Sequence, residues 1–255
     1  MKEMIIIWNL NFINREDLKE HIKNTISTYD QTLNGIDLKK FNSNIIDPIK
    51  MVFDSKVYRQ TFEKVIEAEL VRQRDRTNVN AIGYFHQNIF KYIKNCDVPE
   101  KGFDVIFQKE KDEIIYVEMK NKHNTMNSTS AQKTYTRMLN KIANDKNATC
   151  FLVEAIAKHS QNIVWKVKID DENIENERIR RVSLDKFYEI VTGDKEAFYK
   201  LCMILPDLIN EIISENKELQ VGSDTVIEEL KENNPDLLQA LYLLAFKEYE
   251  GFKNI

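Results

Sequence analysis

Alternating hydrophobic and polar positions predict a β-hairpin near the middle of the chain. Residues 103–107 and 114–120 are apolar-rich stretches of strand length, and the segment between them is polar and charged, as in a tight turn. If Asp104 lies opposite Glu118 in an antiparallel pair, the hairpin centres on Lys111, inside that polar segment. The pattern therefore predicts both the strands and their register.

Helical and strand periodicities fill most of the remaining chain. Apolar residues at helical spacing predict helices over about residues 15–26, 80–95 and 184–192. Two further helices begin at caps: one runs from Ser55 to about residue 71, and the other from Ser128 or Ser130 to about residue 142. The last helices are expected over 194–217, broken or restarted at Pro206, and over 236–249 after an Asn234-Pro235 start. Continuous apolar runs predict buried strands at 5–8, 149–156 and 162–167, with an acidic linker at 170–177. The order helix, hairpin, helix, strand, strand indicates an α/β fold with a mixed sheet flanked by helices.

Composition limits the class of protein. A chain of 255 residues that is 42% hydrophobic can bury one large core, alone or with an appendage. No apolar run approaches the ~18 residues of a membrane span, and the first residues are too short for a signal peptide. The cysteines are odd in number and far apart, which favours reduced thiols in the cytoplasm over a disulfide framework or zinc site: Cys96, Cys150 and Cys202.

Charge is distributed unevenly along the chain. The formal net charge is −4, yet residues 119–149 carry six basic side chains against one acidic side chain, a net of +5. Residues 203–255 carry eleven acids against four bases, a net of −7. A local basic segment can meet phosphates although the whole chain is acidic. A solvated basic face is the alternative interpretation.

Three charged residues of the hairpin share one face of the predicted sheet. Side chains alternate faces along a strand, so Glu118 and Lys120 point the same way. Asp104, directly opposite Glu118, also points that way, with the two Cβ atoms about 5 Å apart. Two carboxylates with few other ligands suit a hard cation that keeps its water, such as Mg²⁺. The pattern indicates metal-dependent cleavage of a phosphodiester, in which the lysine orients or deprotonates water or neutralises charge at phosphorus.

This arrangement resembles the PD-(D/E)XK nuclease superfamily: Asp104, thirteen intervening residues, then Glu118-Met119-Lys120. The superfamily's proline before the aspartate is Phe103 here, a tolerated departure. The resemblance implies catalytic roles for Asp104, Glu118 and Lys120, and binding of Mg²⁺ by Asp104, Glu118 and the Met119 carbonyl. An acid-x-Lys tripeptide alone carries little information in a chain that is 31% charged. The structural alternative is an edge hairpin with a surface Glu-Lys pair.

Further stretches resemble bacterial type II restriction endonucleases, within about residues 72–200: residues 82–87, residues 118–127 extended by 132–135, and residues 182–198. The resemblance points to a family whose known members cut GGNCC-type sites. It implies a restriction-endonuclease-like αβββαβ core with a helical C-terminal part, and a homodimer acting on double-stranded DNA in the bacterial cytoplasm. We expect one nuclease domain over 1–255, with a catalytic core at about 55–168 and a helical subdomain at about 178–255.

Two polar segments are candidates for contact with DNA. Residues 72–78 are expected to form a basic loop, in which Arg74 and Arg76 can reach base edges or phosphates. The second segment follows the catalytic strand and opens the next helix, whose N-terminus suits a phosphate: Asn121, Lys122, His123, Asn124, Gln132 and Lys133. A solvated linker and a disordered loop are the respective alternatives. In some relatives the preceding helix adds a glutamate to the site, and the candidates here are Gln87 and Glu69.

The sequence leaves three functions open. The first is a type II restriction endonuclease that hydrolyses both strands at a specific site with Mg²⁺. The second uses the same chemistry in DNA repair or recombination and reads structure rather than sequence. The third is a non-catalytic DNA-binding module on a nuclease fold. The complete set of Asp104, Glu118 and Lys120 favours an enzyme.

Overall fold

The computed structural model describes residues 8–169, 172–215 and 222–247, without the side chains of residues 30 and 31. The strand expected at 5–8 and the end of the last expected helix lie outside these residues or at their edge. The chain divides into two compact units, 1–25 with 82–216 and 26–81 with 217–255. The helices directly after the sheet belong to the first unit. The expected catalytic core at about 55–168 and helical subdomain at about 178–255 remain predictions.

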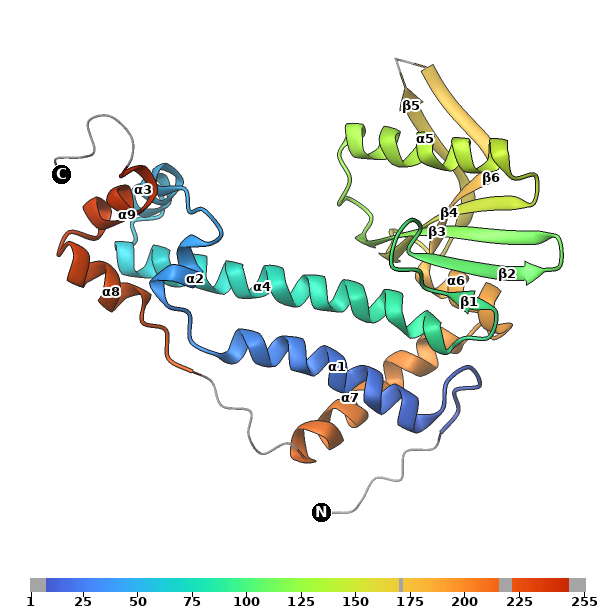
Figure 1. The fold of residues 1–255 in the computed structure, drawn as a ribbon, viewed down its shortest axis with the longest axis horizontal. Coiled ribbons are helices and arrows are strands. Elements are labelled where there is room, and N and C mark those ends of the chain that lie inside the picture. Colours follow the sequence, from blue (N-terminus) through green and yellow to red (C-terminus); the bar gives the residue numbers. More distant parts are fainter. Residues whose placement is uncertain (1–7, 170–171, 216–221, 248–255) are drawn as a thin grey trace. The chain divides into compact units, whose positions relative to one another are not determined.

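The first unit is built on one mixed six-stranded sheet with the order β1-β2-β3-β4-β6-β5 (Figure 1). Pairing is antiparallel from β1 to β3 and between β5 and β6, and parallel from β3 through β4 to β6. The strands are β1 (Cys96–Asp97), β2 (Val105–Glu110), β3 (Glu113–Lys122), β4 (Ala148–Ile156), β5 (Asn162–Ile169) and β6 (Glu172–Ser183). The order α4-β1-β2-β3-α5-β4 reproduces the expected αβββαβ core, so the predicted fold class is confirmed.

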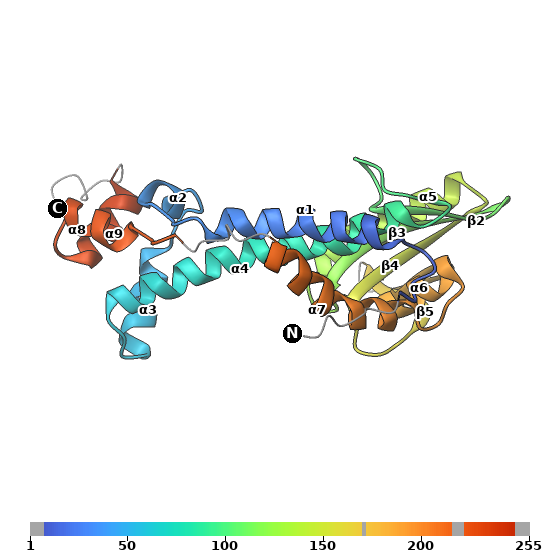
Figure 2. The same cartoon turned by 90° about the horizontal axis from the view of Figure 1, so that it is seen from below.

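Helices cover both faces of this sheet (Figure 2). Helix α5 (Ser128–Asn144) buries one apolar stripe against the face that carries Cys150 and Leu152 of β4. On the other face, Phe187 of α6 (Leu184–Thr192) meets Phe151 with ring centroids 6.4 Å apart. Strand β4 is therefore buried on both sides, which explains its nearly continuous apolar sequence.

The remaining helices are α1 (Arg15–Leu33), α2 (Leu38–Asn42), α3 (Pro48–Val57), α4 (Phe62–Asn88) with a 3₁₀ turn at Ile89–Tyr92, α7 (Ala197–Glu215), α8 (Val226–Asn233) and α9 (Leu237–Phe246). The second unit has its own core, in which Phe41 and Ile66 from the early segment pack with Val226 and Leu241 from the late segment. Gly193, in the left-handed region at φ 73°, ends α6 as expected.

Two predicted irregular segments are regular in the structure. The prediction of a loop at 72–78 is wrong, because α4 continues through these residues. Gln73 is buried and donates a hydrogen bond to the Phe41 carbonyl, and Arg74 pairs with Asp224. Arginine and glutamine are good helix formers, so a polar run need not end a helix. The linker expected at 170–177 is also wrong from residue 172 onward, where β6 pairs with β5.

Helix ends differ from the predictions in three places. Ser55 is buried inside α3 and does not cap the next helix. Helix α7 runs through Pro206 without a break. The cap of α9 is Asp236, whose carboxylate accepts from the backbone of Leu238 and Gln239, not the Asn234-Pro235 pair.

The three cysteines are free thiols. Among the described residues, no helix combines the length and hydropathy needed to cross a membrane.

Candidate active site

The hairpin of β2 and β3 has the predicted register. Val105 pairs with Val117 and Ile106 with Tyr116, and the backbone nitrogen of Asp104 donates to the Val117 carbonyl at 2.8 Å. Asp104 therefore immediately precedes β2, opposite Glu118. The alternation of side chains places Asp104, Glu118 and Lys120 on one face, as predicted.

Asp104 is fixed by its side chain and by its backbone. Its Oδ2 accepts a hydrogen bond from the Met119 backbone nitrogen at 2.7 Å. Gln87 of α4 donates from Nε2 to the Asp104 carbonyl at 3.2 Å. Gln87 thus supports the backbone of the site, and assistance to a metal by Gln87 or Glu69 remains a prediction.

Glu118 holds a cation on each carboxylate oxygen. Lys120 Nζ lies 2.8 Å from Oε1, and the Arg137 guanidinium from α5 pairs with Oε2. The Glu118 side chain is only 13% exposed, so these contacts are partly shielded from water. Two cations therefore neutralise one of the two candidate metal ligands.

Burial raises the pKa of the Asp104 carboxyl above its ordinary value, and the nearby charge of Glu118 adds to this effect. The hydrogen bond from Met119 and the positive charges of Lys120 and Arg137 oppose it. Among the described residues no cation forms an ion pair with Asp104. Glu118 therefore has cationic partners, whereas the ionised form of Asp104 is destabilised.

The donor chemistry of this site fits a hard divalent cation. Asp104 and Glu118 offer carboxylate oxygens as ligands. In the part of the chain that the structure describes, no three His, Cys, Asp or Glu side chains come together as a metal cluster. Two carboxylates suit Mg²⁺, which usually retains several waters, better than zinc, which takes nitrogen or sulfur ligands.

Arg137 is the residue at this site that sequence reasoning missed. Besides Glu118, its guanidinium lies over the Phe103 ring at 4.6 Å and donates to the Gly102 carbonyl at 3.5 Å. Phe103 stands where the superfamily has proline. The only sequence signal for Arg137 was its membership of the basic segment 119–149, because its contact depends on how α5 packs against the sheet.

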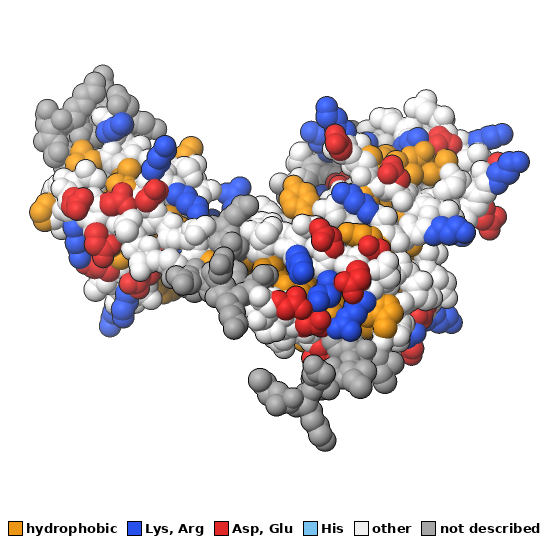
Figure 3. Space-filling model, turned by 60° about the horizontal axis from the view of Figure 1, so that its bottom comes forward, with side chains coloured by type: hydrophobic (Ala, Val, Ile, Leu, Met, Phe, Trp, Pro, Cys, Tyr) orange, Lys and Arg blue, Asp and Glu red, His pale blue; other side chains and the backbone are white. Residues whose placement is uncertain are grey.

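Three of the six basic side chains in the basic segment 119–149 pair with nearby acids. Lys120 and Arg137 share Glu118, and Lys141 pairs with Asp145 at 3.4 Å while lying over the Tyr116 ring. Basic and acidic side chains are interspersed on the face of the molecule shown in Figure 3. A net charge counted along the sequence therefore overstates the positive field near the site.

The predicted DNA-contacting residues fall in two places. Asn121, Lys122, His123 and Asn124 follow directly from Lys120, and Gln132 and Lys133 lie in the first two turns of α5, capped by Asn127. Gln132 donates its amide to the Lys168 carbonyl at 2.7 Å, whereas Lys133 is exposed. Arg74 and Arg76 lie in α4 within the second unit, and so does Glu69, which pairs with Arg72. Contacts between DNA and any of these predicted residues remain predictions.

A buried ion cluster adjoins β3, the strand that carries Glu118 and Lys120. Glu154 of β4, beside Lys120 in the parallel register, is 1% exposed and accepts from Arg181 of β6, with Nε to Oε1 at 2.9 Å. Arg181 Nη2 lies 2.8 Å from His123 Nδ1 and donates to the His123 carbonyl at 3.0 Å. His123 therefore faces this cluster, which ties the segment after Lys120 to two neighbouring strands.

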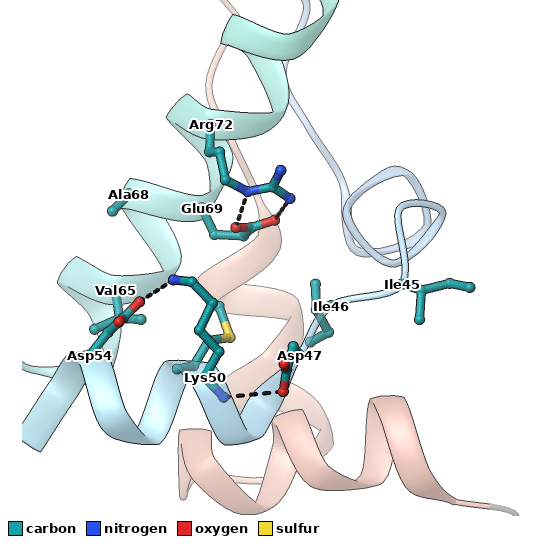
Figure 4. A pocket seen from close by; sticks show the side chains of 10 residues that line it. Ile45, Ile46, Asp47, Lys50, Asp54, Val65, Ala68, Glu69 and Arg72 are labelled. Carbon is teal, nitrogen blue, oxygen red and sulfur yellow. Dashed lines mark hydrogen bonds and ion pairs between the residues drawn. The ribbon is translucent and has the colours of Figure 1, made fainter. Parts of the chain in front are cut away.

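The second unit contains a pocket of about 330 Å³ (Figure 4). Its charged lining has partners within the pocket: Lys50 pairs with Asp54, Arg72 pairs with Glu69, and Asp47 accepts a hydrogen bond from the Lys50 backbone nitrogen. Apolar residues including Ile45 and Val65 line the rest. The pocket lacks the convergent, unpaired polar groups of a catalytic site.

Comparisons with known proteins identify the family of this chain. The sequence model of the Eco47II restriction endonuclease family matches residues 10–214. The type II restriction enzyme Sau96I of Staphylococcus aureus is 32% identical over 245 residues, which cover 91% of this chain and 93% of that enzyme. The type II restriction enzyme Eco47II of Escherichia coli is 26% identical over 216 residues, or 81% of this chain and 89% of that enzyme. The family model covers most of the chain, and Sau96I is similar over nearly its whole length, so the chain belongs to the Eco47II restriction endonuclease family and is a type II restriction endonuclease.

Proposed function

We propose that this enzyme uses Asp104, Glu118 and Lys120 to hydrolyse both strands of DNA at GGNCC-type sites in the presence of Mg²⁺. The observation that supports this most strongly is the convergence of two carboxylates and a lysine on one face of the β2-β3 hairpin. The GGNCC assignment rests on the similarity to Sau96I, an enzyme that recognises GGNCC.

Each residue has a defined task in this proposal. Asp104 and Glu118, with the Met119 carbonyl, hold the metal, which when bound supplies positive charge at the scissile phosphate and acidifies water. The Met119 backbone nitrogen fixes the orientation of the Asp104 carboxylate. Lys120, already 2.8 Å from Glu118, orients or deprotonates the water that attacks phosphorus in line. The products have 5′-phosphate and 3′-hydroxyl ends.

Cleavage of both strands calls for two active sites. A two-fold symmetric homodimer places one site on each strand of a symmetric sequence. We propose such a dimer, acting in the bacterial cytoplasm as part of a restriction-modification system. The exposed segment after Lys120, with Lys122 and Asn124, and Lys133 of α5 follow the catalytic strand and are proposed to contact DNA.

Digestion of unmethylated phage DNA by the purified protein with Mg²⁺ tests this function. We expect discrete bands that disappear with EDTA, with ends that map to one sequence. A smear, or a preference for branched over plain duplexes, would instead favour a nuclease that reads DNA structure. An absence of cutting on both substrates would contradict the proposed activity.

The raised pKa of Asp104 predicts the acid side of the pH profile. Protonation of Asp104 removes a metal ligand, so cleavage should fall as pH decreases through this raised pKa, above the ~3.9 of a free aspartate. Because metal competes with the proton, higher Mg²⁺ should move the acid limb to lower pH. Single-turnover cleavage rates across pH at two Mg²⁺ concentrations measure this shift. If the acid limb of the pH profile does not move when the Mg²⁺ concentration is raised, the group that titrates there is not a metal ligand.

A further inference from the structure

Arg137 occupies a position between the metal ligands and the solvent side of the site. It projects from α5, and its guanidinium contacts the Glu118 carboxylate, the Phe103 ring and the Gly102 carbonyl. These contacts come from the two residues before Asp104 and from Glu118, which lies opposite Asp104 in the hairpin. The Arg137 side chain is still 43% exposed, so the guanidinium is open to an incoming ligand.

The contact with Glu118 places Arg137 in competition with a metal. Arg137 pairs with Oε2, while Lys120 holds Oε1 at 2.8 Å. A cation bound to both Asp104 and Glu118 must take at least one Glu118 oxygen. Arg137 is the partner that can leave, because it reaches Glu118 from a different element, whereas Lys120 lies two residues away on the same strand face.

Phe103 provides a second support for the guanidinium. Arg137 lies over the Phe103 ring at 4.6 Å, and that ring packs on Tyr116 with centroids 5.3 Å apart. A guanidinium stacks on an aromatic face and binds phosphate oxygens through paired donors. An arginine released from Glu118 would therefore remain beside the site, with its donors free for an oxyanion.

We propose that Arg137 exchanges partners during the reaction, from Glu118 in the free enzyme to a phosphate oxygen of the bound DNA. In the free enzyme it lowers the repulsion between the two carboxylates. In the complex it adds positive charge at the phosphate that is cleaved. This inference rests on the proposed function of Asp104 and Glu118 as metal ligands.

The first test is titration of the DNA-free protein with Mn²⁺ by calorimetry. Arg137→Gln removes the competing charge, so we expect about 3- to 10-fold tighter Mn²⁺ binding, in line with the modest coupling of partly exposed ion pairs. Arg137→Lys keeps the charge and should stay near wild type. Lys141→Gln is the matched control, because it removes a cation one turn along α5 that pairs with Asp145 and not with Glu118. Equal or weaker Mn²⁺ binding by Arg137→Gln would overturn the exchange.

The second test is single-turnover cleavage at saturating Mg²⁺. Arg137→Gln should be slower by about 10- to 100-fold despite its tighter metal binding, with partial rescue in Arg137→Lys. An unchanged rate would overturn the phosphate contact. If the wild-type protein cuts no DNA, the proposed function fails, whereas the Mn²⁺ titration still decides whether Arg137 competes for Glu118.

Discussion

Replacing Asp104 with asparagine should abolish cleavage while leaving the protein at least as stable as the wild type. The loss in rate should reach at least about 1,000-fold, or ~4 kcal/mol of transition-state stabilisation, because a metal ligand is removed. Asparagine keeps an oxygen that can accept from the Met119 backbone nitrogen. The local geometry of the hairpin is therefore preserved.

The expected gain in stability follows from the direction of the Asp104 pKa shift. Because the folded-state pKa is raised, the ionised carboxylate costs folding free energy at pH values above that pKa. This cost disappears as pH falls below the unfolded value. At pH 7.5 Asp104→Asn removes it, so the melting temperature should be equal or higher without metal. Plasmid digestion and thermal unfolding measure the two effects.

Asp112→Asn is the matched control for Asp104→Asn, because it changes the same residue type in the exposed turn of the same hairpin. Both activity and melting temperature should match the wild type. If Asp104→Asn unfolds at a lower temperature than Asp112→Asn, Asp104 has a structural role. Cleavage retained by Asp104→Asn would exclude Asp104 as a metal ligand.

Replacing Glu154 with glutamine should have the largest effect on stability. Removing one partner of a buried ion pair costs about 3–5 kcal/mol, since the other charge is left without compensation. Arg181 is 21% exposed and glutamine keeps some hydrogen bonding, so we expect about 2–3 kcal/mol. Urea unfolding at pH 7.5 measures this loss, and Glu154→Gln combined with Arg181→Gln should recover part of it.

Glu175→Gln is the matched control for the ion cluster. Glu175 lies in β6 and pairs with Lys166, but its side chain is 55% exposed and that of Lys166 is 67% exposed. Solvent screens this pair, so the urea midpoint should not change. Equal losses for Glu154→Gln and Glu175→Gln would mean that the buried cluster contributes nothing specific to the fold.

The β2-β3 hairpin could be predicted from sequence because its turn and its strand alternation are both local features. The turn composition sets its centre, and strand alternation then fixes which side chains share a face, so Asp104 and Glu118 were paired correctly. The same local logic failed at residues 72–78. There the polar residues find tertiary partners, such as Arg74 with Asp224, that periodicity along one segment does not contain.

The parts of the site that were missed depend on contacts between distant segments. Arg137 reaches Glu118 only because α5 packs over the sheet. The position of Glu154 within an otherwise apolar strand indicates that it has a partner, because a buried acid is normally avoided unless it is paired. Arg181 is that partner. The identity of the partner depends on the pairing of β4 with residues 179–183 of β6, a strand that the sequence pattern did not predict.

The second unit has a consequence for the timing of protein synthesis. Phe41 and Ile66 are translated early, but their core partners Val226 and Leu241 come after the whole sheet of the first unit. A nascent chain therefore contains every strand of the nuclease sheet before the second core can close. Domains generally fold as units as they leave the ribosome. Until Leu241 has been synthesised, Phe41 and Ile66 therefore lack the late half of their core.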